Sequence, residues 1–360
     1  DSKRFFTMIG TLVGGRVSVA SASVTAMKTA LTIATRYGAR RRQFGPSGEP
    51  EQAILDYRNH KRRLLPRIAE AYGLHFATRH LRKRYKNRSE EDKREVEALA
   101  AGLKAHASWR AIDAIQESRE ACGGEGYMTR NRISELRKDV DIYATFEGDN
   151  TVLMMLLARG LLNKFRKQFE DNKFFSIVSY IADQAATTIT ELNPVTTRNT
   201  DEEHLRSEDF HRSAFEFREN YLMRTSAQRI KKRIDDGMDP FEAFSEIQDH
   251  LLSLSEAHVE RTVLQQFLEA EERCDRQEFK PWLRSLRQLY ALERIHDDVG
   301  WFLENGYVES SKTKAIRSQV NSLCDEIRPQ AVHLVNAFGI PTNCIGAPIA
   351  TGDRIKDPPV

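Results

Sequence analysis

The chain has 360 residues, of which 40% are hydrophobic and 30% charged, and this is enough for two or three hydrophobic cores. Its formal net charge of +3 at pH 7 gives no reason to expect nucleic acid or an anionic membrane as a partner. The four cysteines are scattered without metal-ligand spacing, so neither a metal site nor a disulfide framework is expected.

The first predicted element is a long helix from Phe5 to Tyr37, because apolar residues recur there at helical spacing. Gly14 and Gly15 interrupt this helix, and each costs about 1 kcal/mol relative to alanine. Close approach of another helix or of a ligand would explain that cost. The neighbouring Arg16 is equally compatible with a solvated surface charge and with a site residue, and the residues alone leave this open.

A basic segment follows this helix. Four arginines lie between Arg36 and Arg42, where cations suit the negative pole of a helix dipole, and Gly45-Pro46 is expected to end the helix. Two more helices are predicted, from Glu51 to about Arg84 and from Val96 to Ser118, with a charged turn between them. The latter has a face rich in alanine, so we expect it to pack closely against neighbouring helices.

Two glycine-containing turns come next, Cys122-Gly-Gly-Glu-Gly-Tyr127 and Phe146-Glu-Gly-Asp-Asn150, on either side of a short polar helix. The second turn leads into Val152–Ala158, an apolar run that predicts a buried helix. Glu147 would lie at this junction, which suits a general base, because poor solvation makes a carboxylate more basic. A simple helix cap, with Asp149 or Asn150 accepting backbone N–H bonds, is the alternative, and the local pattern alone favours it.

The rest of the chain is also predicted to be helical, since no strand alternation of useful length appears. A polar segment from Leu192 to Glu203 separates the first helical stretch from the others. The fold class is therefore all-α, with a bundle of four long helices followed by a second helical unit. The helical stretches of this unit cover residues 175–181, 215–234, 241–268, 282–302 and 320–338.

Three separate motifs carry a resemblance to a known family. They are Arg41-Arg-Gln-Phe-Gly45, Arg119-Glu-Ala-Cys-Gly-Gly-Glu-Gly-Tyr127 and Thr145-Phe-Glu-Gly-Asp-Asn-Thr-Val152. They resemble segments of acyl-CoA dehydrogenases and oxidases, and of the oxidase branch in particular, which carries an additional helical unit at its end. The resemblance implies an acyl-CoA dehydrogenase C-terminal-like bundle over residues 1–168 and an oxidase C-terminal helical domain over residues 169–360.

This resemblance implies FAD-dependent oxidation of an acyl-CoA to the trans-2-enoyl-CoA, as in fatty-acid β-oxidation, with O2 as the acceptor and H2O2 as a product. Glu147 matches the family's catalytic base, which removes the α-proton, and its backbone N–H would help to stabilise charge on the thioester oxygen. Arg16 matches an arginine at the entrance for CoA and the acyl chain. Phe146 and Gly148 complete the expected substrate-binding residues.

The resemblance also implies an FAD site that is shared across a homodimer. Arg41 would pair with the pyrophosphate of the FAD in the partner subunit, because a guanidinium fork suits phosphate oxygens. Gln43 and Phe44 would line the same pocket. The other cofactor-binding positions are Glu120, Gly123 and Gly124 near the FAD of the partner subunit, and Asp149 and Thr151 near the adenosine end.

The N-terminal helical and β domains of the family have no counterpart in this sequence. We therefore expect a fragment or a processed product that is inactive alone and purifies without stoichiometric flavin. No apolar stretch reaches bilayer length, so no membrane span is expected. The default location is the cytoplasm, since neither a signal peptide nor a peroxisomal C-terminal signal is seen; the peroxisome stays open if the termini are truncated.

Two alternatives to an oxidase remain. The first is an acyl-CoA dehydrogenase that passes electrons to an electron-transfer flavoprotein, and release of peroxide without an added acceptor would separate it from an oxidase. The second is a non-catalytic helical scaffold for dimerisation. A Glu147→Gln substitution distinguishes this one, because a scaffold has no base to lose.

Overall fold

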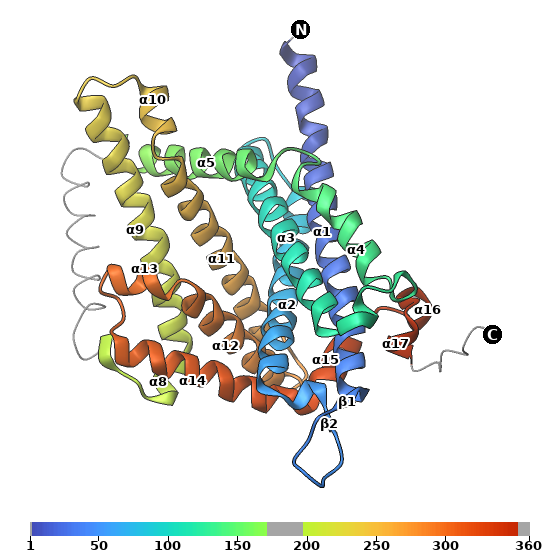
Figure 1. The fold of residues 1–360 in the computed structure, drawn as a ribbon. Coiled ribbons are helices and arrows are strands. Elements are labelled where there is room, and N and C mark those ends of the chain that lie inside the picture. Colours follow the sequence, from blue (N-terminus) through green and yellow to red (C-terminus); the bar gives the residue numbers. More distant parts are fainter. Residues whose placement is uncertain (1, 171–196, 352–360) are drawn as a thin grey trace.

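The computed structural model describes residues 2–170 and 197–351, and for residues 2–11 and 166–170 it describes the helical backbone only. Three long helices form the first half: α1 (Ser2–Arg40), α2 (Arg58–Lys86) and α3 (Lys93–Ala121). They pack side by side (Figure 1). Ala101, Ala105 and Ala111 on α3 are fully buried, so the close packing expected of its alanine-rich face is confirmed.

A short hairpin lies between α1 and α2. Strand β1 (Arg42–Gln43) pairs antiparallel with β2 (Gln52–Ala53), and the 3-10 helix η1 (Ile54–Asp56) follows. Two predicted boundaries are therefore wrong, because α1 ends at Arg40, before Gly45-Pro46, and α2 begins at Arg58, after Glu51. Pairing across the hairpin satisfies backbone groups that the prediction assigned to helices.

The two glycine turns form short helical segments around the predicted polar helix. These are η2 (Gly123–Gly126), η3 (Thr129–Asn131), α4 (Ile133–Asp141) and η4 (Ile142–Ala144), and they lead into α5 (Asn150–Glu170). Helix α5 is the fourth long helix of the predicted bundle. In Figure 1 it runs transverse to α3, on which it packs, and so leads the chain away from the first three helices.

The second half is helical throughout the part of it that the structure describes, so the all-α fold class is confirmed. Three predicted helices are divided: two of them near residue 246 and at residue 298, and the stretch 320–338 by a 3-10 helix at residues 328–330. The predicted stretch at residues 175–181 lies outside the described residues. The helices are α8 (Glu202–Arg206), α9 (Glu208–Asp235), α10 (Pro240–Ser245), α11 (Gln248–Glu272), α12 (Lys280–Asp297), α13 (Val299–Glu304), α14 (Ser310–Ile327), η5 (Arg328–Gln330), α15 (Ala331–Asn336), α16 (Thr342–Ile345) and α17 (Pro348–Thr351).

The two halves share one hydrophobic core. Gly73 of α2 illustrates the contact, because a Cβ at this position would lie 2.7 Å from Cγ1 of Val263 and 3.1 Å from Cδ2 of Phe267, both on α11. Near the end of the chain, α15 and α17 return to pack against α1 (Figure 1). A domain boundary at residues 168–169 stays a prediction, since the core is continuous across both halves.

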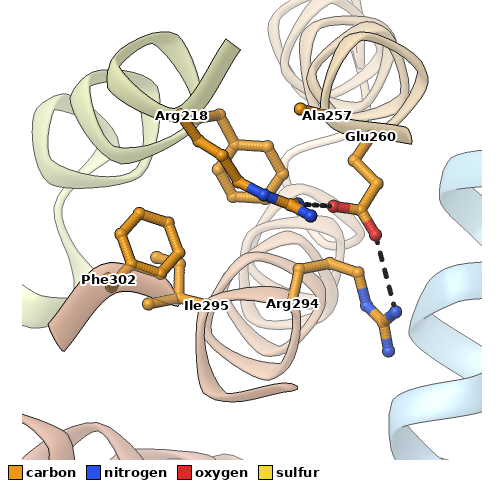
Figure 2. A pocket seen from close by; sticks show the side chains of 7 residues that line it. Arg218, Ala257, Glu260, Arg294, Ile295 and Phe302 are labelled. Carbon is orange, nitrogen blue, oxygen red and sulfur yellow. Dashed lines mark hydrogen bonds and ion pairs between the residues drawn. The ribbon is translucent and has the colours of Figure 1, made fainter. Parts of the chain in front are cut away.

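A cluster of buried ion pairs lies where the halves meet. Figure 2 shows Arg218 of α9, Glu260 of α11 and Arg294 of α12, with Arg218 at 2.6 Å and Arg294 at 3.6 Å from the Glu260 carboxylate. On the other side, Glu70 of α2 binds Arg110 of α3 at 2.5 Å and lies 4.0 Å from Arg294. These five residues, the buried ion cluster, connect helices from both halves.

Among the described residues, one segment has the length and composition of a membrane span: Leu12–Arg40 of α1. Small and polar residues interrupt every purely apolar run in it, which is why no membrane span was predicted. In this fold 61% of its most apolar stretch is buried against other helices. A core helix passes the same test, so this is weak evidence for a span.

Candidate active site

Glu147 occupies an unusual backbone position just before α5. Its φ of 60° and the φ of 117° at Gly148 both lie in the left-handed region. For a residue other than glycine such a conformation costs of the order of 1–3 kcal/mol and persists only where the surroundings hold it. It turns the Glu147 side chain toward α1.

Asp149 caps the following helix. Its Oδ1 accepts hydrogen bonds from the backbone N–H groups of Thr151 at 2.9 Å and Val152 at 3.2 Å. The helix-cap interpretation of this turn is therefore confirmed for Asp149. It does not involve the Glu147 carboxylate, so it is compatible with a general base at Glu147, which stays a prediction.

The carboxylate of Glu147 lies directly on Gly15 of α1, where a Cβ would overlap its Cδ and both oxygens. At the adjacent Gly14, a Cβ would lie 2.8 Å from the hydroxyl of Tyr85 on α2. The close approach expected at the two glycines is therefore confirmed. One carboxylate oxygen of Glu147, Oε2, is buried and has no hydrogen-bond partner among the described residues. Such an oxygen is suited to accept a proton.

Two cations hold the consecutive carbonyl groups of this turn. Nε of Arg16 donates to the carbonyl oxygen of Glu147 at 3.1 Å, and Nζ of Lys104 on α3 donates to that of Gly148 at 2.8 Å. Lys104 also donates to Oδ1 of Asn150 at 2.8 Å, and the amide of Asn150 donates to Oγ of Ser108 at 2.9 Å. Helices α1 and α3 thus fix the turn from two sides.

The electrostatics of these groups follow from their burial. Desolvation lowers the pKa of Lys104 to about 8, although the charges of Asp149 and Glu147 favour its protonated form. Desolvation also lowers the pKa of Arg16, against the attraction of Glu147. Because both cations lose hydration here, their attraction for a neighbouring carboxylate is stronger than it would be in water.

The predicted substrate-binding residues either flank Glu147 in the turn or contact it from α1. Arg16 is half-buried beside it, and Gly148 follows it in the turn. The Phe146 side chain is 55% exposed, and that of Val152 on α5 is 64% exposed. The Glu147 backbone N–H donates to no acceptor in the part of the chain that the structure describes. The site therefore offers a carboxylate, an available N–H group and an apolar rim.

Three of the predicted cofactor-binding residues lie in the hairpin at the far end of α1. Arg41 is exposed and forms no ion pair with the described residues. The carbonyl oxygen of Gln43 accepts from the Tyr57 hydroxyl at 3.0 Å. Phe44 has a φ of 59°, is 73% exposed and meets the Tyr57 ring edge-on with centroids 6.3 Å apart. The hairpin presents an arginine and an aromatic ring outward.

Glu120, Gly123 and Gly124 lie at the corresponding end of α3. Glu120 pairs with Arg63 of α2 at 2.6 Å. Gly123 has a φ of 57°, and a Cβ on Gly123 or Gly124 would meet nothing within 4 Å. Because a Cβ at either glycine would meet open space, the glycine turn is open, and it lies at the same end of the bundle as the hairpin. Burial raises the pKa of Tyr37 at this end of α1, and the charge of Arg41 acts against this rise.

The structure thus divides the predicted residues into two sets. Glu147, Arg16, Phe146, Gly148, Asp149 and Thr151 form one, and Arg41, Gln43, Phe44, Glu120, Gly123 and Gly124 form the other. Arg16 and Arg41 are separated by 25 residues of α1, or about 37 Å at 1.5 Å per residue. The two sets cannot contact the same small group within one chain.

Residues 9–162 match the family model described as the acyl-CoA oxidase C-alpha1 domain, and residues 209–353 match the one described as acyl-CoA oxidase. The chain belongs to the acyl-CoA oxidase family. The peroxisomal acyl-coenzyme A oxidase 2 of Arabidopsis thaliana is 40% identical over 353 residues, which cover 97% of this chain and 51% of that protein. The chain spans about half the length of the curated relatives it matches.

Solved acyl-CoA oxidases have the same fold. The crystal structure of acyl-CoA oxidase 3 from Yarrowia lipolytica superposes with a TM-score of 0.83 at 29% identity, over 95% of this chain and 51% of that chain. Acyl-CoA oxidase 2 of Caenorhabditis elegans, described as bound with FAD, ascaroside-CoA and ATP, gives a TM-score of 0.80 at 25% identity, over 95% of this chain and 50% of that chain.

Sequence reasoning did not single out Lys104, which contacts this turn. Lys104 lies on a buried face of α3 with Ala100, Ala101 and Ser108, and a lysine within such a face is a signal that could have found it. Its contacts follow from the packing of helices rather than from a local motif.

Proposed function

We propose that this chain supplies the catalytic base and part of the FAD site of an acyl-CoA oxidase, which converts an acyl-CoA to the trans-2-enoyl-CoA and O2 to H2O2. The observation that carries the proposal is the position of Glu147. Its carboxylate is seated on Gly15, and one buried oxygen has no partner among the described residues.

In this proposal Glu147 removes the proton α to the thioester carbonyl, and its Oε2 accepts that proton. Negative charge then develops on the thioester oxygen, where the backbone N–H of Glu147 can donate a hydrogen bond. Arg16 fixes the carbonyl of the same residue, so the carboxylate and the N–H group keep their relative positions. FAD, held by Arg41, Gly123 and Gly124 of the partner subunit, would supply the acceptor for the β-hydrogen and the path of the electrons to O2.

The residues at the far end of α1 fit an FAD site. Arg41 has an exposed guanidinium with no ion pair to the described residues, as a pyrophosphate ligand requires. Gly123 and Gly124 leave open space where side chains would otherwise stand, so a bulky cofactor can approach the backbone. The exposed Phe44 ring offers an apolar surface beside them. This set would hold FAD without taking part in proton removal.

The distance between the two sets supports a homodimer. Because Arg41 lies about 37 Å from Arg16 along α1, the hairpin set of one chain serves the FAD whose substrate meets Glu147 of the other chain. Asp149 and Thr151, next to the base, would contact the adenosine end of the FAD in their own subunit. The peroxisomal name of the Arabidopsis relative favours a peroxisomal location over the cytoplasm.

The test is a Glu147→Gln substitution in the FAD-loaded full-length protein that contains this chain. Glutamine keeps the shape of the side chain but cannot accept the proton, so we expect turnover of acyl-CoA to fall by about 10²–10⁴-fold. Turnover is followed as peroxide release without an added electron acceptor, and the flavin content is read from the absorbance spectrum.

The matched control is Glu135→Gln, which changes an exposed carboxylate on α4 and should leave turnover intact. Unchanged turnover in Glu147→Gln would show that Glu147 is not the base. A parent protein that turns over only with an added acceptor is a dehydrogenase. One that binds no flavin and no acyl-CoA is a scaffold.

A further inference from the structure

Lys104 is a buried cation whose side-chain hydrogen bonds go to the turn that carries the proposed base. We propose that Lys104 is a positioning residue for Glu147, which holds the Gly148 carbonyl and so keeps the turn in the conformation that seats the carboxylate on Gly15. The inference rests on the proposed function, because it concerns the same base.

The contacts of Lys104 are unusual for a lysine. Its side chain is completely buried within α3, and its ammonium donates to the Gly148 carbonyl and to Oδ1 of Asn150, each at 2.8 Å. Among the described residues no carboxylate lies within ion-pair distance of it. Burying a cation without a paired anion costs several kcal/mol, so packing alone would favour an apolar side chain here. The two acceptors of Lys104 instead belong to the turn that carries Glu147.

The turn needs such contacts to keep its backbone conformation. Glu147 has a φ of 60°, which a residue other than glycine adopts only when its surroundings impose it. Arg16 imposes it from α1 through the Glu147 carbonyl, and Lys104 imposes it from α3 through the next carbonyl. If either bond is lost, the turn can relax and the carboxylate can leave Gly15.

Lys104 also acts through its charge, because the ammonium interacts favourably with both Asp149 and Glu147. Lys104 therefore acts on the turn in two ways: its hydrogen bonds hold the Gly148 carbonyl and Asn150, and its charge attracts the neighbouring carboxylates.

Two substitutions in the FAD-loaded full-length protein separate these effects. Lys104→Met removes the hydrogen bonds and the charge, and we expect kcat to fall by about 100-fold with KM little changed, as for a misplacement of about 1 Å. Lys104→Gln keeps a donor for the Gly148 carbonyl but removes the charge. We expect it to recover part of the kcat that Lys104→Met loses.

A second readout needs neither flavin nor turnover. Hydrogen–deuterium exchange of the chain should be faster in residues 145–153 of Lys104→Met, while the core of α2 and α11 stays protected. The matched control is Lys312→Met, because Lys312 is another fully buried lysine and burial also lowers its pKa to about 8. This control should destabilise the fold without changing kcat or exchange in the turn.

Unchanged kcat and unchanged exchange in Lys104→Met would overturn the inference, and so would an equal loss of kcat in Lys312→Met. If Lys104→Met does not fold, Lys104→Gln decides, since wild-type kcat together with wild-type exchange in residues 145–153 of that variant contradicts the inference. Glu147→Gln separates the two proposals. Retained turnover there removes the proposed function, whereas lost turnover with normal Lys104 variants removes only this inference.

Discussion

At the scale of single residues, Gly15 has the clearest reason for its identity. Glycine within a helix is unfavourable by about 1 kcal/mol relative to alanine, yet α1 has glycine where the Glu147 carboxylate needs the space of a Cβ. Local helix stability therefore favours alanine at this position, whereas the place of the Glu147 carboxylate, the proposed base, requires glycine. The structure follows the second demand, as is common at functional sites.

Gly15→Ala tests this opposition. Alanine should raise the helix propensity of α1 by about 1 kcal/mol, but its methyl group displaces the Glu147 carboxylate. We expect turnover of the FAD-loaded full-length protein to fall by about 100-fold while the thermal unfolding midpoint stays equal or rises. Gly300→Ala is the control, because a Cβ there meets nothing within 4 Å and turnover should not change. Full turnover in Gly15→Ala would show that turnover does not depend on the position of the Glu147 carboxylate against Gly15.

At the scale of elements, the sequence predicted the apolar faces of the long helices but not the residues at which these helices begin and end. Helical periodicity predicted α1, α2 and α3, and the alanine-rich face of α3 predicted close packing. The start of α2 was wrong because the residues before it pair with Arg42 and Gln43, and pairing between segments leaves no periodic signal. The motif predicted Glu147 as the base, and this role stays a prediction. Lys104 was not singled out, because its proposed role depends on the turn that lies opposite α3.

Close packing of α3 gives a prediction of its own. A Cβ on Gly102 would overlap the Leu157 side chain of α5 and lie 3.0 Å from Cγ2 of Val259 on α11. Gly102→Val should therefore lower the free energy of unfolding by about 1–3 kcal/mol through overpacking. Urea unfolding followed by circular dichroism measures this change. The same substitution at Gly300, where there is open space, should cost much less; equal losses at the two positions would rule out overpacking as the cause.

At the scale of the whole molecule, the buried ion cluster joins the two halves through charge as well as through the hydrophobic core. Glu70, Glu260 and Arg294 are each buried, and the arginines around Glu70 hold its pKa below the usual range, against its desolvation. Removing one partner from such a cluster leaves a buried charge uncompensated. The sequence could not predict the cluster, because its members come from five helices with no common spacing.

One carboxyl group beside the cluster gives the molecule a pH dependence. Burial raises the pKa of Glu256 to about 7 from an ordinary value of 4.5, and the charge of Glu260 raises it further, against the opposing effect of Arg218. Because the folded chain binds this proton more tightly than the unfolded chain, the contribution to stability is complete below about pH 4.5. It is lost as the pH rises toward 7.

Glu256→Gln removes this titration, so the variant should be more stable than the wild type at pH 8 and nearly equal to it at pH 4.5. One pKa unit corresponds to 1.36 kcal/mol, so the gain at pH 8 is up to about 3 kcal/mol. Burial lowers the pKa of His106 to about 4, so buried histidines of this kind destabilise both proteins in acid. Their contribution is the same in the variant and the wild type, so it cancels when the two free energies of unfolding are subtracted. Urea unfolding at several pH values measures the difference, with Glu272→Gln at an exposed position as the control. A constant difference between Glu256→Gln and the wild type across this range would mean that the Glu256 carboxyl group titrates alike in the folded and unfolded chains.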